Sequence, residues 1–144
     1  EVLSRLAHSL AIRAEVDAAI RFGEEAVAMA EQLALDEQRV RALTSLGLAR
    51  SFLGDPQGVA DMERALELAV SLNSPEAASL YNNLGFIALT EGDVRRYAEL
   101  HAESLRTARR FGDERMVRFS RWSHRSAELS DSAVQPRFVA APCL

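Results

Sequence analysis

The sequence predicts an all-α fold: a helical solenoid of about three antiparallel helix pairs, followed by one C-terminal helix. The first observation behind this prediction is a period, because Ala30, Ala69 and Ala108 recur at a constant step of 39 in the numbering. The second is that apolar residues fall at helical spacing almost throughout, while Gly and Pro gather where turns are expected. A period between about 20 and 50 residues is typical of stacked repeats, in which each unit buries its apolar face against its neighbours.

The first helix pair is expected at residues 2–13 and 16–34, with a turn at Ala14-Glu15. Leu3, Leu6 and Leu10 give the first of these helices an apolar face at helical spacing. The second helix of the pair, residues 16–34, also carries apolar residues at helical spacing.

The second and third pairs carry stronger turn signals. Gly54-Asp55-Pro56 joins the helices of the second pair, and Gly92-Asp93 joins those of the third. Gly relaxes the backbone after one helix, Asp caps the next helix, and Pro fits a first helical position. The four helices of these pairs are expected at 37–53, 56–72, 75–91 and 94–111.

A closing helix is expected at residues 114–129, after a cap at Asp113. Beyond it Pro136 and Pro142 prevent a regular helix, so residues 130–144 are expected to form a disordered tail. The chain would then hold one repeat domain over residues 1–129. Its units are expected at 1–36, 37–74 and 75–113.

The composition is that of one ordinary soluble domain. Of the 144 residues 48% are hydrophobic and 26% are charged, and no apolar run approaches the roughly 20 residues that span a bilayer. All 17 basic residues are Arg, which we attribute to a GC-rich genome. The single Cys143 forms no intramolecular disulfide, so a reducing cytoplasm is expected. The first residues lack an initiator Met and a secretory signal, so we expect the chain to begin within a longer reading frame.

Small residues are expected where two helices of a pair approach each other closely. Ala7, Gly47 and Gly85 stand in the middle of successive first helices, at steps of 40 and 38 in the numbering. A larger side chain at such a point would wedge the helices apart.

Six short motifs stand at matching places in the second and third units: Leu46-Gly47, Gly54-Asp55, Ala65-Leu66, Leu84-Gly85, Gly92-Asp93 and Ser104-Leu105. They resemble the tetratricopeptide repeat, whose units have Leu-Gly in helix A, a Gly-Asp turn and a small residue late in helix B. The resemblance covers roughly residues 2–129, and it implies a right-handed superhelical array with the A helices lining its concave face. The step of 39 exceeds the usual 34 of that repeat and is similar to the longer repeats of MalT-like and ATPase-linked bacterial signalling regulators.

Two residues depart from this repeat pattern. Tyr97 occupies a position in the third helix B that is usually small, and Arg50 stands where an aromatic or apolar residue is usual. We therefore expect the local packing to differ at both places.

The repeat register assigns nine residues to the concave face, and several of them are apolar. Such a stripe could accept an amphipathic helix or an extended segment, although an equal case is that the chain itself covers it. These candidate partner-binding residues are His8, Ile12, Arg41, Thr44, Leu48, Phe52, Asn82, Phe86 and Leu89.

A basic stretch lies near the C-terminal end of the predicted domain, in a chain whose net charge is −4. It could attract nucleic acid or another acidic partner. Arg at three- and four-residue spacing is more often a solvated helix face, so we do not expect a nucleic-acid partner. The patch consists of Arg106, Arg109, Arg110, Arg115, Arg118, Arg121 and Arg125.

The sequence carries no constellation typical of an enzyme. The three His residues stand apart without a second metal ligand nearby, and the Gly residues are dispersed rather than grouped in a phosphate-binding loop. We expect no catalysis, no cofactor and no metal. The leading hypothesis is a non-catalytic module for protein interaction or ligand sensing within a larger bacterial signalling or transcriptional regulator. The alternative is a free-standing adaptor or a repeat protein that associates with its own copies.

Overall fold

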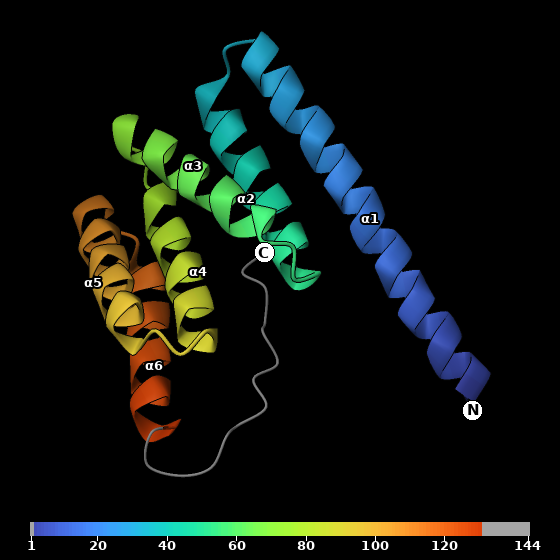
Figure 1. Cartoon of the computed structure of the whole chain (residues 1–144). Coiled ribbons are helices and arrows are strands. Elements are labelled where there is room, and N and C mark those ends of the chain that lie inside the picture. The colour runs from blue at the N-terminus through green and yellow to red at the C-terminus, as the bar shows by residue number, and fades with distance from the viewer. Residues whose placement is uncertain (1, 131–144) are drawn as a thin grey trace.

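The computed structural model describes the backbone of residues 2–130 and the side chains of residues 15–122. Over that range the chain forms six α-helices and no strand, so the all-α prediction is confirmed. The tail predicted at 130–144 lies, beyond its first residue, outside the described residues. The helices are α1 (Val2–Gln32), α2 (Asp36–Phe52), α3 (Gln57–Ser71), α4 (Glu76–Thr90), α5 (Val94–Phe111) and α6 (Glu114–Ser130) (Figure 1).

Helices α2 to α6 begin and end within one residue of the predicted positions. The prediction for the first pair was wrong, because α1 runs unbroken through Ala14-Glu15, where a turn was expected. Ala and Glu are among the best helix formers, and residues 2–22 contain neither Gly nor Pro. The helix therefore continues where the other pairs turn.

The residues in left-handed backbone conformation fall into two spaced series. The first contains Ala34, Asn73 and Gly112, which have φ of 51°, 52° and 68° and repeat the period found in the sequence. Each ends a helix, and a backbone hydrogen bond of 2.8 to 2.9 Å closes each end in the same way. These bonds run from the N–H groups of Leu35, Ser74 and Asp113 to the carbonyl oxygens of Ala30, Ala69 and Ala108.

The second series contains Gly54 and Gly92, at φ of 73° and 83°. Each lies in the turn inside a helix pair, where a residue with a Cβ would be strained. Asp55 and Asp93 follow them, and both carboxylates accept a hydrogen bond of 2.9 Å from the backbone N–H of a residue in or at the start of the next helix. The predicted Asp cap is confirmed at Asp93, while α3 begins one residue after Pro56, which stands at its N-cap in place of the predicted first helical position. Ala14-Glu15 offers no Gly-Asp turn.

Each helix packs against the next one in the chain, while α2 also touches α4, and α4 touches α6. In Figure 1 the helices α2, α4 and α6 run one way, and α1, α3 and α5 run the other way. The N-terminal half of α1 extends past the end of α2 and away from the other helices (Figure 1).

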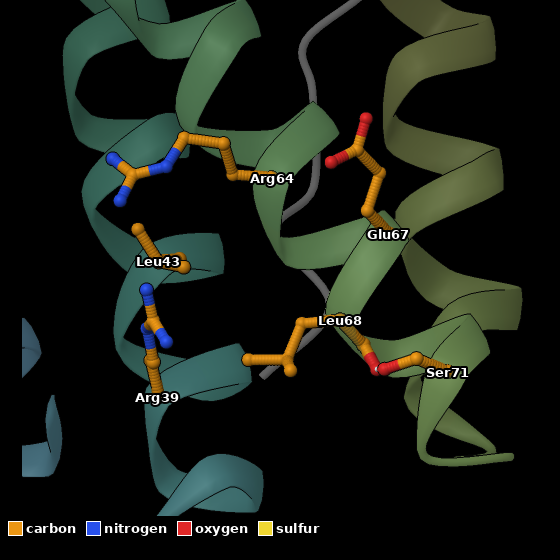
Figure 2. A pocket seen from close by; sticks show the side chains of 6 residues that line it. All are labelled: Arg39, Leu43, Arg64, Glu67, Leu68 and Ser71. Atoms are coloured by element: carbon orange, nitrogen blue, oxygen red, sulfur yellow. Dashed lines mark hydrogen bonds between the residues drawn. The ribbon is translucent and has the colours of Figure 1, made fainter.

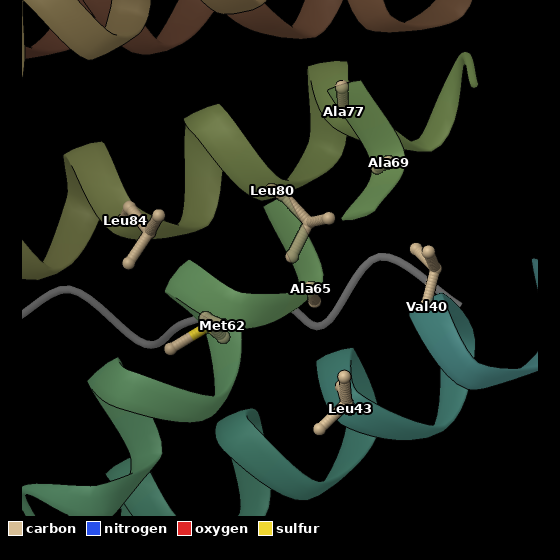
Figure 3. Close-up of a cluster of buried hydrophobic side chains, with 8 residues drawn as sticks. All are labelled: Val40, Leu43, Met62, Ala65, Ala69, Ala77, Leu80 and Leu84. Carbon is tan, nitrogen blue, oxygen red and sulfur yellow. The ribbon is translucent and has the colours of Figure 1, made fainter. Parts of the chain in front are cut away.

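The core lies between α2, α3 and α4, and a smaller cluster joins α4, α5 and α6. Figure 3 shows that the side chains of the main cluster converge from three helices. Its residues are Val40, Leu43, Met62, Ala65, Ala69, Ala77, Leu80 and Leu84, and the smaller cluster contains Ala78, Ala108, Met116 and Val117.

Gly47 on α2 and Gly85 on α4 differ in how closely the neighbouring helix approaches them. A Cβ on Gly47 would lie only 2.7 Å from the carbonyl oxygen of Gly58, so α2 and α3 touch through their backbones. A Cβ on Gly85 would lie 3.5 Å from its nearest neighbour, the Leu100 Cβ, which is an ordinary contact. The requirement for a small residue is therefore strict at Gly47 and loose at Gly85.

Candidate protein-interaction surface

Four of the predicted partner-binding residues form one stripe along α2. Arg41, Thr44, Leu48 and Phe52 follow one another at steps of three and four residues, which places them on one side of the helix. Phe52 is 67% exposed, whereas Leu48 is half-buried against the main core cluster. The Thr44 hydroxyl donates to the carbonyl oxygen of Val40 at 2.8 Å, so it serves the helix itself.

Three further predicted residues form the matching stripe on α4. Asn82 and Leu89 are half-buried, and Phe86 between them is 39% exposed. The spacing of four and then three residues keeps all three on one side of α4.

Polar contacts join α2 to the start of α4 and to the residue two positions before it. Arg41 Nε lies 3.2 Å from the Glu76 carboxylate, and the Ser74 hydroxyl donates to the Glu37 carboxylate at 3.2 Å. Helices α2 and α4 run in the same direction and contact each other (Figure 1). We call the seven described residues of these stripes the α2/α4 face. The side chains of His8 and Ile12, also predicted for this surface, lie outside the described residues.

The predicted basic patch is partly neutralised. Arg106 pairs with Glu103 one turn earlier, and the Arg110 guanidinium lies 5.5 Å from the centre of the Phe111 ring. Among residues 15–122 no salt bridge involves Arg109, Arg115, Arg118 or Arg121, and all four are exposed. The Arg125 side chain lies outside that range.

A buried ion pair, which sequence reasoning missed, holds three helices together around Arg50. Its guanidinium pairs with Asp61 on α3 and Glu24 on α1, and it lies 3.8 Å from Asp55 in the turn. The Asp61 residue is only 3% exposed. Burial lowers the pKa of Arg50, but the hydrogen bond to Asp61 and the three negative charges outweigh it and raise that pKa. The sequence signal for this network was Arg50 itself, which stands where the resemblance predicts an aromatic or apolar residue.

A second polar cluster lies buried where α4, α5 and α6 meet. His101 Nε2 lies 2.7 Å from the carbonyl oxygen of Ser120, and the Ser104 hydroxyl donates to the carbonyl oxygen of Ala78 at 2.8 Å. The Tyr97 ring lies beside the His101 ring, with 5.5 Å between the ring centroids and an angle of 42° between the ring planes. His101 and Ser104 are buried and contact backbone groups of the adjoining helices, so the cluster fixes the packing of the helices.

A shallow depression of about 320 Å³ lies between α2 and α3 (Figure 2). Arg39 and Arg64 lie on it, but Glu31 of α1 already lies 2.7 Å and 3.8 Å from their guanidinium groups. The remaining lining residues are Leu43, Glu67, Leu68 and Ser71. The depression is therefore a poor site for an anionic ligand.

Within the described part of the chain, no three His, Cys, Asp or Glu residues are grouped as a metal ion would need. None of the described helices combines the length and the apolar character that crossing a membrane requires.

No family model and no curated protein matches the chain. Among solved structures it is similar to BtubC (BKLC) from P. vanneervenii, with 19% sequence identity and a TM-score of 0.58. The likeness covers 96% of this chain and 66% of BtubC, so the chain spans just under two thirds of that protein's length. At this identity the likeness shows a shared helical fold and carries no function across.

Proposed function

We propose that the chain is a tetratricopeptide-like repeat module without catalytic activity, and that its α2/α4 face binds an amphipathic helix of another protein segment. The repeat assignment is supported by the evenly spaced left-handed residues at helix ends and by the Gly-Asp turns. It is also supported by the alternating direction of neighbouring helices (Figure 1).

The observation that carries the binding proposal is the pair of exposed aromatic rings, Phe52 and Phe86, on adjacent helices that run the same way. Aromatic side chains, Phe among them, are enriched at protein interfaces relative to the rest of the surface. Half-buried Leu48 and Leu89 accompany them and extend the apolar surface along each stripe. An amphipathic helix presents apolar anchors at three- and four-residue steps, which suits two such stripes.

The resemblance to the longer repeats suggests that this module belongs to a bacterial signalling regulator, in which it would work beside an ATPase or an output domain. In that setting the bound segment could come from another domain of the same parent chain. This part of the proposal rests on the resemblance alone.

The test is a selection of helix-forming peptides displayed on phage against the immobilised chain, followed by fluorescence anisotropy with the selected peptides. We expect Phe52→Arg and Phe86→Arg each to weaken binding at least tenfold, because each removes an apolar anchor and adds a charge. The control is Val94→Arg on α5, since Val94 is 63% exposed and lies on another helix. Peptides that bind all three variants as tightly as the wild type would refute the proposed face.

A further inference from the structure

Helix α6 stands in the same relation to α4 as α4 does to α2. It runs in the direction of these two helices, and it contacts α4 (Figure 1). The chain also enters α4 and α6 in the same way, because the N–H groups of Ser74 and Asp113 close the ends of the preceding helices and lie one period of 39 residues apart. Residues of α6 can therefore be compared with the residues of α4 that lie 39 positions earlier.

Burial shows that α6 is turned about its axis as α4 is. Ala77 and Ala78 of α4 are buried, and so are their equivalents on α6, Met116 and Val117. Each residue of an α-helix is rotated by a fixed angle from the one before it, so two adjacent buried positions define the rotation of the helix. Equivalent residues of α4 and α6 therefore point to the same side of the array.

The side of α6 that corresponds to the α2/α4 face carries two arginines. Arg121 is the equivalent of Asn82, which belongs to that face, and Arg118 lies one turn earlier on the same side of α6. Both arginines are exposed. We call Arg118 and Arg121 the α6 arginines. The surface thus leads from apolar residues on α2 and α4 to a basic end on α6.

The α6 arginines differ from the arginines in the middle of the chain because no carboxylate neutralises them. Every arginine from Arg39 to Arg106 forms a salt bridge with at least one Asp or Glu. Among the side chains of residues 15–122, by contrast, no salt bridge involves Arg118 or Arg121. Their charges are therefore available to acidic groups of a partner.

The surface is positive at its α6 end only. None of the seven residues of the α2/α4 face is Asp or Glu, although the chain contains 21 of these residues and has a net charge of −4. The charge of Arg41, on α2, is neutralised by Glu76. A surface that is apolar at one end and basic at the other complements a segment that is apolar at one end and acidic at the other.

We propose that the segment bound by the α2/α4 face is acidic at one end, and that its carboxylates pair with the α6 arginines while its apolar residues pack around Phe86. This inference rests on the proposed function and names the chemistry of the partner. Arg121 lies one helix across and one turn back from Phe86, which is roughly 12 Å for helix axes about 10 Å apart. The acidic residues should therefore follow the apolar anchor within about eight residues of a helix, at 1.5 Å per residue.

A nucleic acid is the other acidic ligand that exposed arginines attract. It suits this surface less well, because a chain with a net charge of −4 repels a polyanion as a whole. The apolar side chains of Phe86 and of half-buried Leu48 and Leu89 also favour a peptide, since they offer contacts that phosphate groups cannot use. The observations thus favour an acidic amphipathic helix.

The probe is a fluorescein-labelled helical peptide with Leu at steps of three and four and a short run of Glu at its N-terminal end. Two matched peptides carry Gln or Lys in place of the Glu residues. Fluorescence anisotropy at about 0.1 M salt measures their affinities. We expect the Glu peptide to bind about fivefold more tightly than the Gln peptide, as two exposed ion pairs would give, and the difference to shrink as salt is added.

Substitution of both α6 arginines tests where the carboxylates bind. The double variant Arg118→Gln/Arg121→Gln should bind the Glu and Gln peptides equally well, and Gln keeps the helix because it is a good helix former. The double variant Arg118→Glu/Arg121→Glu should prefer the Lys peptide. The matched control is Arg21→Glu, which lowers the net charge by the same two units as the Gln pair. Arg21 is exposed on α1, which does not contact α6 among the described helices, so this control should keep the fivefold preference.

Phe86→Arg separates this inference from the proposed function. It should weaken the binding of the Glu peptide and of the Gln peptide alike, because both use the apolar anchor. If Phe86→Arg weakens both peptides but the wild type binds them equally well, or the Gln pair keeps the preference, the inference is overturned and the proposed function stands. If neither peptide binds the wild type, or Phe86→Arg weakens neither, both are overturned.

A labelled oligothymidine strand tests the nucleic-acid alternative in the same assay. We expect it to bind the wild type more weakly than the Glu peptide does. Tighter binding of the oligothymidine, lost in the double variant Arg118→Gln/Arg121→Gln, would assign the α6 arginines to phosphate groups and overturn the inference.

Discussion

The α2/α3 pair and the α4/α5 pair occupy equivalent places along the repeat period, but different contacts hold them together. In the first pair the backbones meet at Gly47 and Gly58, and a Cβ on Gly58 would lie 2.6 Å from the Gly47 carbonyl oxygen. In the second pair the equivalent residues are Gly85 and Tyr97, and a full aromatic ring fills the space between the helices.

The polar contacts differ in the same way. The α2/α3 pair contains the buried ion pair of Arg50 with Asp61, while the α4/α5 pair has Ala88 and Leu100 at the equivalent positions. One backbone arrangement is therefore compatible with either a close polar contact or a wider apolar one. Because the contacts differ, equivalent substitutions in the two helix pairs should change the free energy of unfolding by different amounts.

The largest effect is expected from Arg50→Ala. The substitution leaves the buried Asp61 carboxylate without its main partner, so the free energy of unfolding should fall by about 3 kcal/mol. Urea unfolding followed by circular dichroism measures it. Combining it with Asp61→Leu makes the α2/α3 pair resemble the α4/α5 pair and should restore most of the loss. A double variant less stable than Arg50→Ala would show that the two pairs are not interchangeable.

The next effect separates the two glycine positions. Gly58→Ala should lower the free energy of unfolding by about 2 kcal/mol, because its Cβ would meet backbone atoms of α2 at 2.6 Å. Gly85→Ala should leave stability unchanged or raise it by up to about 1 kcal/mol, since a methyl fits there and Ala favours a helix. The same unfolding assay compares them, and equal losses at both sites would contradict the difference in helix separation.

Tyr97→Phe should stabilise the α4/α5 pair by about 1 kcal/mol. The Tyr97 hydroxyl is buried and finds no hydrogen-bond partner in the described part of the chain, so its removal relieves a desolvation cost. Thermal unfolding measures the gain, with Tyr81→Phe at pH 7 as the comparison. A lower melting temperature for Tyr97→Phe would mean that the hydroxyl has a partner after all.

The smallest effect is expected at alkaline pH and concerns Tyr81, which stands where α2 has Leu43. Burial raises the pKa of Tyr81, the charge of Glu103 raises it further, and Arg106 partly opposes both. The folded state therefore holds this proton more tightly than the unfolded state, so stability is constant below about pH 10 and falls as the pH rises through the folded pKa. Tyr81→Phe should show a shallower fall in unfolding free energy above that pH, and identical slopes would contradict the assignment.

The helices from α2 onward could be predicted because their ends are marked by residues with a local physical role. Gly54 and Gly92 adopt φ values that other residues avoid, and Asp93 and Asp113 cap the following helices through their side chains. Such signals act within a few residues, so sequence reasoning can find them.

The first unit was harder to predict, because periodicity alone suggested a turn that local chemistry does not support. Ala14-Glu15 lies at the expected spacing, but both residues favour a helix, and α1 continues through them. The contacts of Arg50 and Tyr97 were missed for another reason. Their partners lie on other helices, and only the rotation of each helix about its axis decides which side chains meet.

The described helices contact only helices that are next or next but one along the chain. Few distant segments must therefore find each other during folding, and the loss of chain entropy before the first native contacts form is small. Such a chain can acquire structure from one end as it leaves the ribosome, each helix docking on the one before it. Among the described helices α1 emerges first and gains its partner α2 soon afterwards, so the order of docking can follow the order of synthesis.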